Sequence, residues 1–331
     1  MNPSELPELN AALTAVRQAA VVCRSVQASM DPDALKKKDS SPVTVADFAS
    51  QALICRQLQQ EYPNDPVIGE EGADQLRKPE GGAFLRLVHQ ECVAAGEPCS
   101  VDDVCDWIDR GQQSAYCSRF WTLDPIDGTK GFLRKDQYAI SLALIIDGTI
   151  ALGVLGCPGL PVNSGEPDGA CGVLAWAVQG KGSWMVPLDS AESPPRRLHV
   201  TDTQQASAGR FCESVESGHS SHDWSGKIAS VLNITREPFR IDSQCKYLAV
   251  ARGDADIYLR LPTRRDYQEK IWDHAGGVIL VEEAGGCVTD IHGIPPEFNH
   301  GRTLSTNEGM IVTNGRFHQR VVDVVGTCAP A

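Results

Sequence analysis

The nine residues from Trp121 to Thr129 (WTLDPIDGT) constrain the fold more than any other part of the sequence. An apolar run leads into Asp124, as in a buried strand; the following proline bends the chain, and a glycine permits a tight exit. Such a turn would bring two carboxylates, Asp124 and Asp127, to one point, with the Ile126 carbonyl between them. Oxygen ligands of this kind suit a hard cation such as Mg²⁺. Taken alone, the stretch is also compatible with an Asp-rich β-turn that binds nothing.

The composition is that of a folded protein of about two domains. The chain has 331 residues, of which 42% are hydrophobic and 22% charged; this excludes a disordered chain, a collagen and a coiled coil. Acidic residues outnumber basic ones by 43 to 30, a formal net charge of −13. Binding to a nucleic-acid polymer is therefore not expected, because it requires basic residues that replace phosphate counterions. The surplus carboxylates either form a solvated surface or, in part, converge on metal ions.

Helices packed on an antiparallel sheet are expected in the N-terminal half. Apolar residues recur at helical spacing over 5–30 and about 44–61. Two more helices are expected in a polar insertion at 73–118, the second starting at Ser100 in a capping box. The expected strands lie at 66–69, 120–123, 138–146, 149–156, 173–178 and 183–186.

A Pro- and Ser-rich stretch, Ser190–Arg197, is a predicted linker. After it, short apolar strands alternate with helices, which is typical of a layered α/β domain. The chain is therefore predicted to belong to the α/β class, with an N-terminal α+β domain at 1–193 and a C-terminal α/β domain at 194–331. The strands expected in the second part lie at 211–215, 239–241, 256–261, 287–291 and 310–312, and the helices at about 223–233, 244–252, 272–284 and 315–326.

Targeting and redox signals are weak in this sequence. The N-terminus carries Glu5 and Glu8 without a signal peptide's basic and apolar regions, and no apolar run approaches the ~20 residues of a membrane helix. We expect a cytoplasmic protein with no membrane partner; a chloroplast or mitochondrial location after removal of a transit peptide is the alternative. The twelve cysteines include no C-x-x-C pair, so we expect free thiols. A reversible disulfide is the alternative for the cysteines within one polar stretch, namely Cys92, Cys99, Cys105 and Cys117.

Two further carboxylates follow predicted structural elements. Glu70 stands where the strand at 66–69 ends, and Asp273 stands at a predicted helix start. A solvated loop charge and a simple helix N-cap are the ordinary alternatives for these two residues. The haloacid-dehalogenase type of phosphatase is excluded because its nucleophilic Asp would fall at Pro125. The D-x-x-D spacing indicates attack by water held on a metal, without an aspartyl phosphate.

Three ordered motifs give the sequence a specific resemblance. GEE at 69–71, DPIDGT at 124–129 and WDHAG at 272–276, the last followed by EAGG at 283–286, resemble the lithium-sensitive, Mg²⁺-dependent inositol monophosphatase-like phosphatase superfamily. The similarity runs from about residue 10 to residue 325. It implies a layered αβαβα sandwich of the inositol monophosphatase and fructose-1,6-bisphosphatase type.

Within this superfamily the chain is most similar to the bisphosphate nucleotidases of the yeast and plant type. ESGHSSH at 216–222 and IDSQCKY at 241–247 distinguish this branch from the inositol monophosphatases. The chain departs from the pattern at Cys245, where relatives commonly have Ala, and in the cysteine-rich character of 92–117. Neither departure affects a predicted metal ligand.

The resemblance assigns a role to each matching residue. Asp47 and Thr129 would be catalytic: Asp47 would hydrogen-bond Thr129 and a metal-bound water. Two to three Mg²⁺ ions would be held by Glu70, Asp124, the Ile126 carbonyl, Asp127 and Asp273. The substrate would be bound by Thr129, His219, Ser243, Lys246 and Arg260, for which a surface loop, a helix cap and solvated bases are the ordinary alternatives taken singly.

The resemblance implies hydrolysis of a small nucleotide. The expected reaction removes the 3′-phosphate of adenosine 3′,5′-bisphosphate, and also of 3′-phosphoadenosine 5′-phosphosulfate, by attack of metal-activated water. A monomer that is inhibited by Li⁺ is expected. An inositol polyphosphate 1-phosphatase is the first alternative, and a non-catalytic nucleotide or redox sensor is the second. The sensor would require a broken metal site, whereas all five carboxylates are present.

Overall fold

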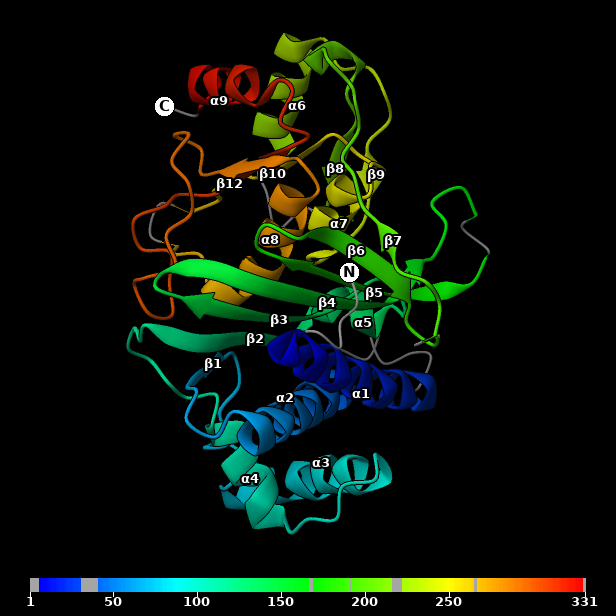
Figure 1. The fold of residues 1–331 in the computed structure, drawn as a ribbon, viewed down its shortest axis with the longest axis vertical. Coiled ribbons are helices and arrows are strands. Elements are labelled where there is room, and N and C mark those ends of the chain that lie inside the picture. The colour runs from blue at the N-terminus through cyan, green and yellow to red at the C-terminus, as the bar shows by residue number, and fades with distance from the viewer. Residues whose placement is uncertain are drawn as a thin grey trace.

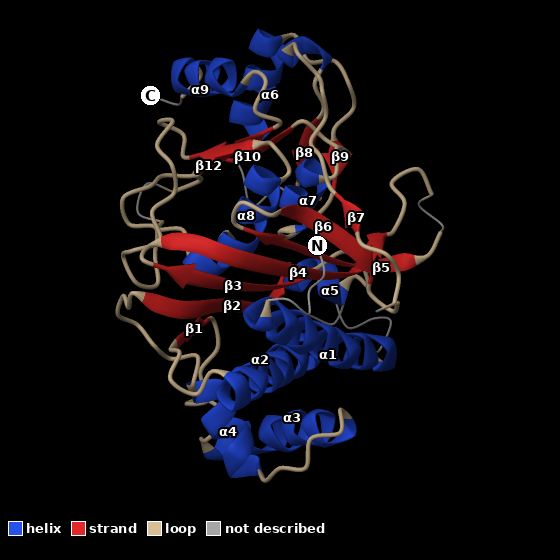
Figure 2. Ribbon diagram, in the orientation of Figure 1, coloured by secondary structure: helices blue, strands red, loops and turns tan. Residues whose placement is uncertain are grey.

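The computed structural model describes residues 6–30, 41–166, 169–190, 192–215, 222–264 and 267–329. Helices and sheets alternate in layers along the long axis of the molecule, as Figures 1 and 2 show. The predicted α/β class and the αβαβα layering are therefore confirmed. Within the described residues, no helix is both long and apolar enough to cross a membrane.

The first helical layer covers one face of the larger sheet. Helices α1 and α2 lie against the sheet, and α3 and α4 lie beyond them, farther from it (Figure 1). The Ser100 side chain caps α4 in the predicted capping box with Asp103. The bounds of these helices are Pro7–Ser29 (α1), Ser41–Glu61 (α2), Gly82–Ala94 (α3) and Val101–Asp109 (α4).

The larger sheet has seven strands in the order β1-β2-β3-β4-β5-β6-β7. All neighbours are antiparallel except β1 and β2, which run parallel. Strand β2 continues to Asp127, so the prediction that it ends at residues 123–124 is wrong. Strand β7 falls in the predicted linker, where it pairs with β6. The bounds are Val67–Gly69 (β1), Arg119–Asp127 (β2), Ala139–Ile146 (β3), Thr149–Pro161 (β4), Cys171–Val178 (β5), Gly182–Pro187 (β6) and Arg196–Arg197 (β7).

The smaller sheet has five strands in the order β11-β12-β10-β8-β9, and helices fill both of its sides. Helices α7 and α8 lie between the two sheets, and α6 and α9 form the outer layer (Figure 2). The division into domains at residue 193 stays a prediction. The bounds are Phe211–Glu213 (β8), His222–Leu232 (α6), Phe239–Arg240 (β9), Cys245–Ala251 (α7), Ile257–Arg260 (β10), Ala275–Glu283 (α8), Cys287–Thr289 (β11), Met310–Thr313 (β12) and His318–Thr327 (α9), with a short helix α5 at Thr129–Leu133.

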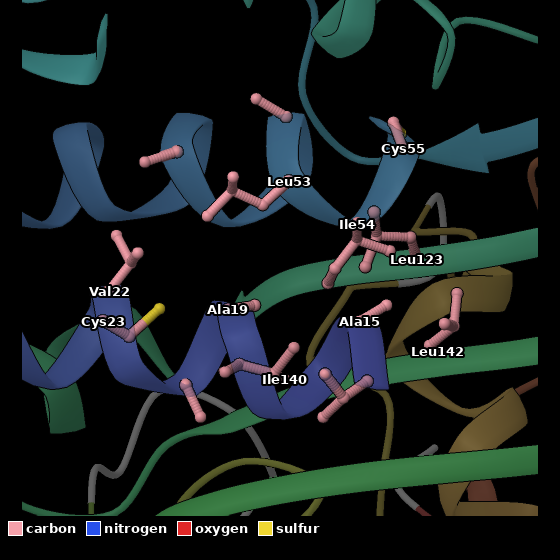
Figure 3. Packing of buried hydrophobic residues seen from close by; sticks show 14 of the residues in the cluster. Ala15, Ala19, Val22, Cys23, Leu53, Ile54, Cys55, Leu123, Ile140 and Leu142 are labelled. Carbon is pink, nitrogen blue, oxygen red and sulfur yellow. The ribbon is translucent and has the colours of Figure 1, made fainter. Parts of the chain in front are cut away.

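Small side chains on α1 allow close packing in the first layer. Ala15 and Ala19 face α2, where Leu53 and Ile54 project toward them (Figure 3). All four are fully buried, and the same cluster continues onto Leu123 of β2. Burying such apolar area is the main favourable term in folding. The packing fixes α2 over the end of β2, where the carboxylates of the DPIDGT motif lie.

Candidate active site

The parallel pair β1 and β2 places two carboxylates side by side. Gly69 lies opposite Leu123 in the register, so both strands end at the same edge of the sheet. Glu70 and Asp124 follow these residues, and the Glu70 amide donates to the Leu123 carbonyl (3.2 Å). The two side chains also hydrogen-bond each other. A parallel pair therefore accounts for the proximity of residues that lie 54 positions apart.

A β-bulge brings Asp127 to the same face as Asp124. Residues three apart in a regular strand point to opposite faces. Here Asp124 lies opposite Ser141 while Asp127 lies opposite Ala139, so β2 carries one extra residue against β3. Bulges of this kind redirect side chains, and Pro125, which has no N–H to donate to the ladder, lies within this one. The Asp127 carboxylate accepts a hydrogen bond from the Gln244 backbone N–H (2.5 Å).

Asp273 reaches the site from the turn before α8. It lies in a 3₁₀ turn, and its side chain does not cap α8, which has His274 at the N-cap position. Its carboxylate instead pairs with the Arg260 guanidinium (3.2 Å), which also pairs with Glu269 (2.7 Å). Asp273 is therefore not the helix cap that sequence alone left open.

These groups line a cavity of about 420 Å³. Carboxylates line it together with basic side chains that could bind an anion. Lys246 is buried, with its ammonium nitrogen 5.2 Å from the centre of the Tyr258 ring. Ser243 has a left-handed backbone (φ 63°), and its Cβ lies where a side chain at Gly128 would collide with it (2.9 Å). The lining includes Glu70, Asp124, Ile126, Asp127, Thr129, Ser243, Lys246, Arg260 and Asp273.

Burial and mutual repulsion raise the pKa values of the carboxyl groups. Burial first, and then the Asp273 charge, raises the pKa of Glu70 to about 8 and that of Asp127 to about 6. Burial and the Glu70 charge hold the pKa of Asp124 well above its usual range. A group of carboxylates this close is strained at neutral pH unless a cation neutralises it.

The donor set fits a hard divalent cation. One Asp124 oxygen, Oδ1, is buried and has no hydrogen-bond partner, although buried polar atoms normally have one. Glu269, Asp273 and His274 also lie close enough together to hold an ion. Both His274 ring nitrogens are occupied, however, by Tyr247 (2.7 Å) and Glu269 (3.1 Å). Of these three residues, Asp273 alone lines the cavity with the other carboxylates, so it is the candidate ligand.

Stability without divalent cations is expected to fall as pH rises from about 4, where unfolded Asp and Glu ionise, to about 8. The pKa values of Glu70 and Asp127 are raised in the folded state, so the folded chain binds more protons than the unfolded chain in this range. The resulting stabilisation is present at the acidic end and is lost as pH rises through the folded-state pKa values. Denaturant titrations in EDTA at several pH values measure it, and Mg²⁺ should flatten the slope. A metal-free protein that gains stability with rising pH over this range would contradict this assignment.

The two residues expected to be catalytic lie in different places. Thr129 is exposed at the start of α5 and lines the cavity. Asp47 is buried on α2, outside the lining; burial and the charges of Glu71 and Glu70 hold its pKa well above the usual range. Within the described part of the chain, no hydrogen bond joins Asp47 to Thr129, so the expected pairing is absent. The remaining predicted residue, His219, lies outside the described residues, as does most of its loop.

Sequence reasoning missed the polar residues that hold the ligand segments in place. On α2, the buried Ser50 hydroxyl donates to the Pro125 carbonyl (3.1 Å), and Gln51 bonds the backbone of Glu71 in both directions. Two adjacent polar residues in an otherwise apolar helical pattern are a signal from which buried hydrogen bonds could have been predicted. Arg302 offered no such signal: it donates to the Gly69 carbonyl (2.7 Å) from more than 230 residues away and stacks on the Trp272 ring.

The comparisons with known proteins agree with this geometry. The inositol monophosphatase family profile matches residues 5–328, and the chain therefore belongs to the inositol monophosphatase family. It is 42% identical to the 3′(2′),5′-bisphosphate nucleotidase of Schizosaccharomyces pombe, over 96% of this chain and 94% of that protein. It is also 42% identical to the Oryza sativa protein of the same name, over 93% and 90% of the two chains.

Solved structures share the fold at lower identity. The Thermotoga maritima IMPase aligns with a TM-score of 0.64 and 19% identity, covering 98% of both chains. Mycobacterium tuberculosis SuhB aligns with a TM-score of 0.62 and 19% identity, over 99% of this chain and 98% of that one. At this level of identity the likeness concerns the fold.

Proposed function

We propose that this protein is a Mg²⁺-dependent phosphatase that removes the 3′-phosphate of adenosine 3′,5′-bisphosphate, giving AMP and phosphate, and that also accepts 3′-phosphoadenosine 5′-phosphosulfate. One observation supports this most: five carboxylates, four of them the predicted metal ligands, line a single cavity together with the buried Lys246 and the half-buried Arg260. A site with both kinds of charge suits a ligand that is bound through divalent cations at one end and through basic side chains at the other. The names of the relatives at 42% identity point to the same substrate class.

The chain's own groups divide the work in this proposal. Glu70, Asp124, Asp127 and Asp273, which line the cavity together with Ile126, would hold two to three Mg²⁺ ions with the Ile126 carbonyl. When bound, these ions would neutralise the carboxylates, polarise the phosphate ester and lower the pKa of water at the site.

Asp47 and Thr129 handle the proton in this proposal. Burial, and then the charges of Glu71 and Glu70, raise the pKa of Asp47, which makes its carboxylate a stronger base than an ordinary one. Thr129 lines the cavity, and its hydroxyl would donate a hydrogen bond to a phosphate oxygen. Because water is the nucleophile in this proposal, no aspartate has to become phosphorylated.

Substrate binding is assigned to basic and hydroxyl side chains that line the same cavity beside the carboxylates. Lys246 and Arg260 bind the 5′-phosphate through charge-assisted hydrogen bonds, which are about twice as strong as neutral ones. Ser243 adds a hydroxyl at the same loop, and His219 is proposed to flank the adenosine. We also propose that the protein acts as a monomer in the cytoplasm, with organelles as the alternative.

Phosphate release decides between this function and its nearest rival. Adenosine 3′,5′-bisphosphate, inositol 1,4-bisphosphate and inositol 1-phosphate are each supplied with Mg²⁺, with Mg²⁺ and millimolar Li⁺, and with EDTA. We expect the adenosine substrate to be hydrolysed fastest, inhibition by Li⁺, and no release in EDTA. Faster release from inositol 1,4-bisphosphate would favour an inositol polyphosphate 1-phosphatase. Release that is unchanged in EDTA would overturn metal dependence.

A further inference from the structure

The buried Gln244 side chain makes three hydrogen bonds. It is 1% exposed. Its amide nitrogen donates to the Trp272 carbonyl (2.9 Å). Its amide oxygen accepts from the Gly277 N–H (3.1 Å) and from the Ser141 hydroxyl (3.2 Å). Both halves of the amide are therefore used.

Three hydrogen bonds of Gln244 reach a carboxylate of the candidate metal site or a residue beside one. The Gln244 backbone N–H donates directly to Asp127. Ser141 lies opposite Asp124 in the register of β2 and β3. Trp272 immediately precedes Asp273. One residue thus bonds to, or beside, three metal-ligand candidates that come from two separate segments of the chain, β2 and the turn before α8.

Gln244 also lies between two of the proposed substrate-binding residues. Ser243 precedes it with a left-handed backbone, and Lys246 follows two residues later. Any shift of Gln244 would move this loop and relax the metal-binding segments together. In the described part of the chain, the Gln51 side chain also bonds the segment of a ligand candidate, but it bonds only the Glu70–Glu71 side of the site.

We propose that Gln244 is a positioning residue that holds the metal-binding carboxylates and the phosphate-binding loop in one fixed arrangement, so that it couples metal binding to phosphate binding. The roles of those two groups rest on the proposed function. An amide is required because the three partners are a carbonyl, an N–H and a hydroxyl. An apolar side chain would leave all three buried without partners, and a carboxylate would face the Trp272 carbonyl.

Gln244→Met tests this with a side chain of similar length and no hydrogen-bonding amide. The matched control is Asn314→Leu, because Asn314 is also a fully buried amide that donates to Thr203 (2.9 Å) and accepts from Arg316 (3.1 Å), but it does not line the cavity. Both variants are expected to unfold at a lower temperature than wild type. Titration with Mn²⁺ alone, followed by electron paramagnetic resonance, measures metal binding without catalysis. Inorganic phosphate is then titrated with and without Mn²⁺.

We expect Gln244→Met to bind Mn²⁺ about 10- to 100-fold more weakly, as for other residues that orient metal ligands. The enhancement of phosphate binding by Mn²⁺ should also decrease, whereas Asn314→Leu should keep wild-type values for both. Wild-type Mn²⁺ affinity and undiminished coupling in a folded Gln244→Met protein would overturn the proposal. An equal loss in Asn314→Leu would do so too, since the effect would then be one of general stability.

A milder variant keeps the test decisive if Gln244→Met does not fold. Ser141→Ala removes one of the three side-chain bonds and should weaken Mn²⁺ binding by about two- to tenfold. Unchanged Mn²⁺ binding and coupling in Ser141→Ala would then count against the proposal. These readouts need no turnover, so they separate failure of the positioning role from failure of the proposed substrate.

Discussion

The Asp124→Asn variant is expected to lose at least about a thousandfold in Mg²⁺-dependent phosphate release from adenosine 3′,5′-bisphosphate, as measured by kcat/KM. A bound metal ion stabilises transition-state charge by several kcal/mol, and about 4 kcal/mol corresponds to a factor of a thousand. Asp124 is 2% exposed, and one of its oxygens has no hydrogen-bond partner among the residues that the structure describes. An amide at this position would keep the volume of the side chain and lose the negative charge that binds a cation.

The same substitution should act on stability in the opposite direction. Burial and the Glu70 charge raise the pKa of Asp124, so its ionised form destabilises the metal-free fold at neutral pH. In EDTA, Asp124→Asn should therefore unfold at a higher temperature than wild type, whereas Mg²⁺ should stabilise it less. Asp106→Asn is the matched control, because the Asp106 side chain on α4 is 78% exposed and should change neither quantity. Mg²⁺-dependent turnover of Asp124→Asn within tenfold of wild type would remove this residue from the metal site.

Lys246→Met is expected to distinguish substrates by their second phosphate. It should lower kcat/KM for adenosine 3′,5′-bisphosphate by about 10- to 100-fold, because a charge-assisted hydrogen bond contributes about 1.5–3 kcal/mol. For adenosine 3′-monophosphate, which has no 5′-phosphate, the change should stay below about threefold. The Lys246 ammonium is buried against Tyr258 at the cavity wall, so bulk water does not screen it strongly.

Comparison of the two substrates also tests a rival role for Lys246. Its charge acts on Asp127 and lowers that carboxyl's pKa, so Lys246→Met could alter metal binding instead. A metal effect would reduce turnover of both adenosine substrates equally, and this outcome would contradict the assignment to the 5′-phosphate. Lys181→Met provides the control, since Lys181 is exposed in the turn between β5 and β6.

Local patterns were sufficient for most of the fold. The expected helices and strands are present in the described residues, because their apolar spacing matches the layers that bury them. The capping box at Ser100 is a local interaction and was predicted correctly. The end of β2 was not, since proline and glycine suggested a turn after Asp124, whereas the strand continues through a bulge to Asp127.

The carboxylates of the site could be identified from motifs, but their supports could not. Glu70 follows β1, Asp124 and Asp127 lie in β2, and Asp273 precedes α8, and the structure brings them to one cavity. Gln244 bonds partners that lie 28 to 117 residues away. No local periodicity encodes such contacts, because they exist only after both sheets have packed on α7 and α8.

In β2, regular pairing with β3 conflicts with the orientation that the candidate site requires of Asp127. A strand without the extra residue would form an unbroken ladder with β3, and would turn the Asp127 side chain to the opposite face of the sheet. The most regular sheet that this chain could form would thus be an inactive one. The bulge therefore sacrifices regular pairing with β3 so that Asp127 and Asp124 lie on the same face of the sheet.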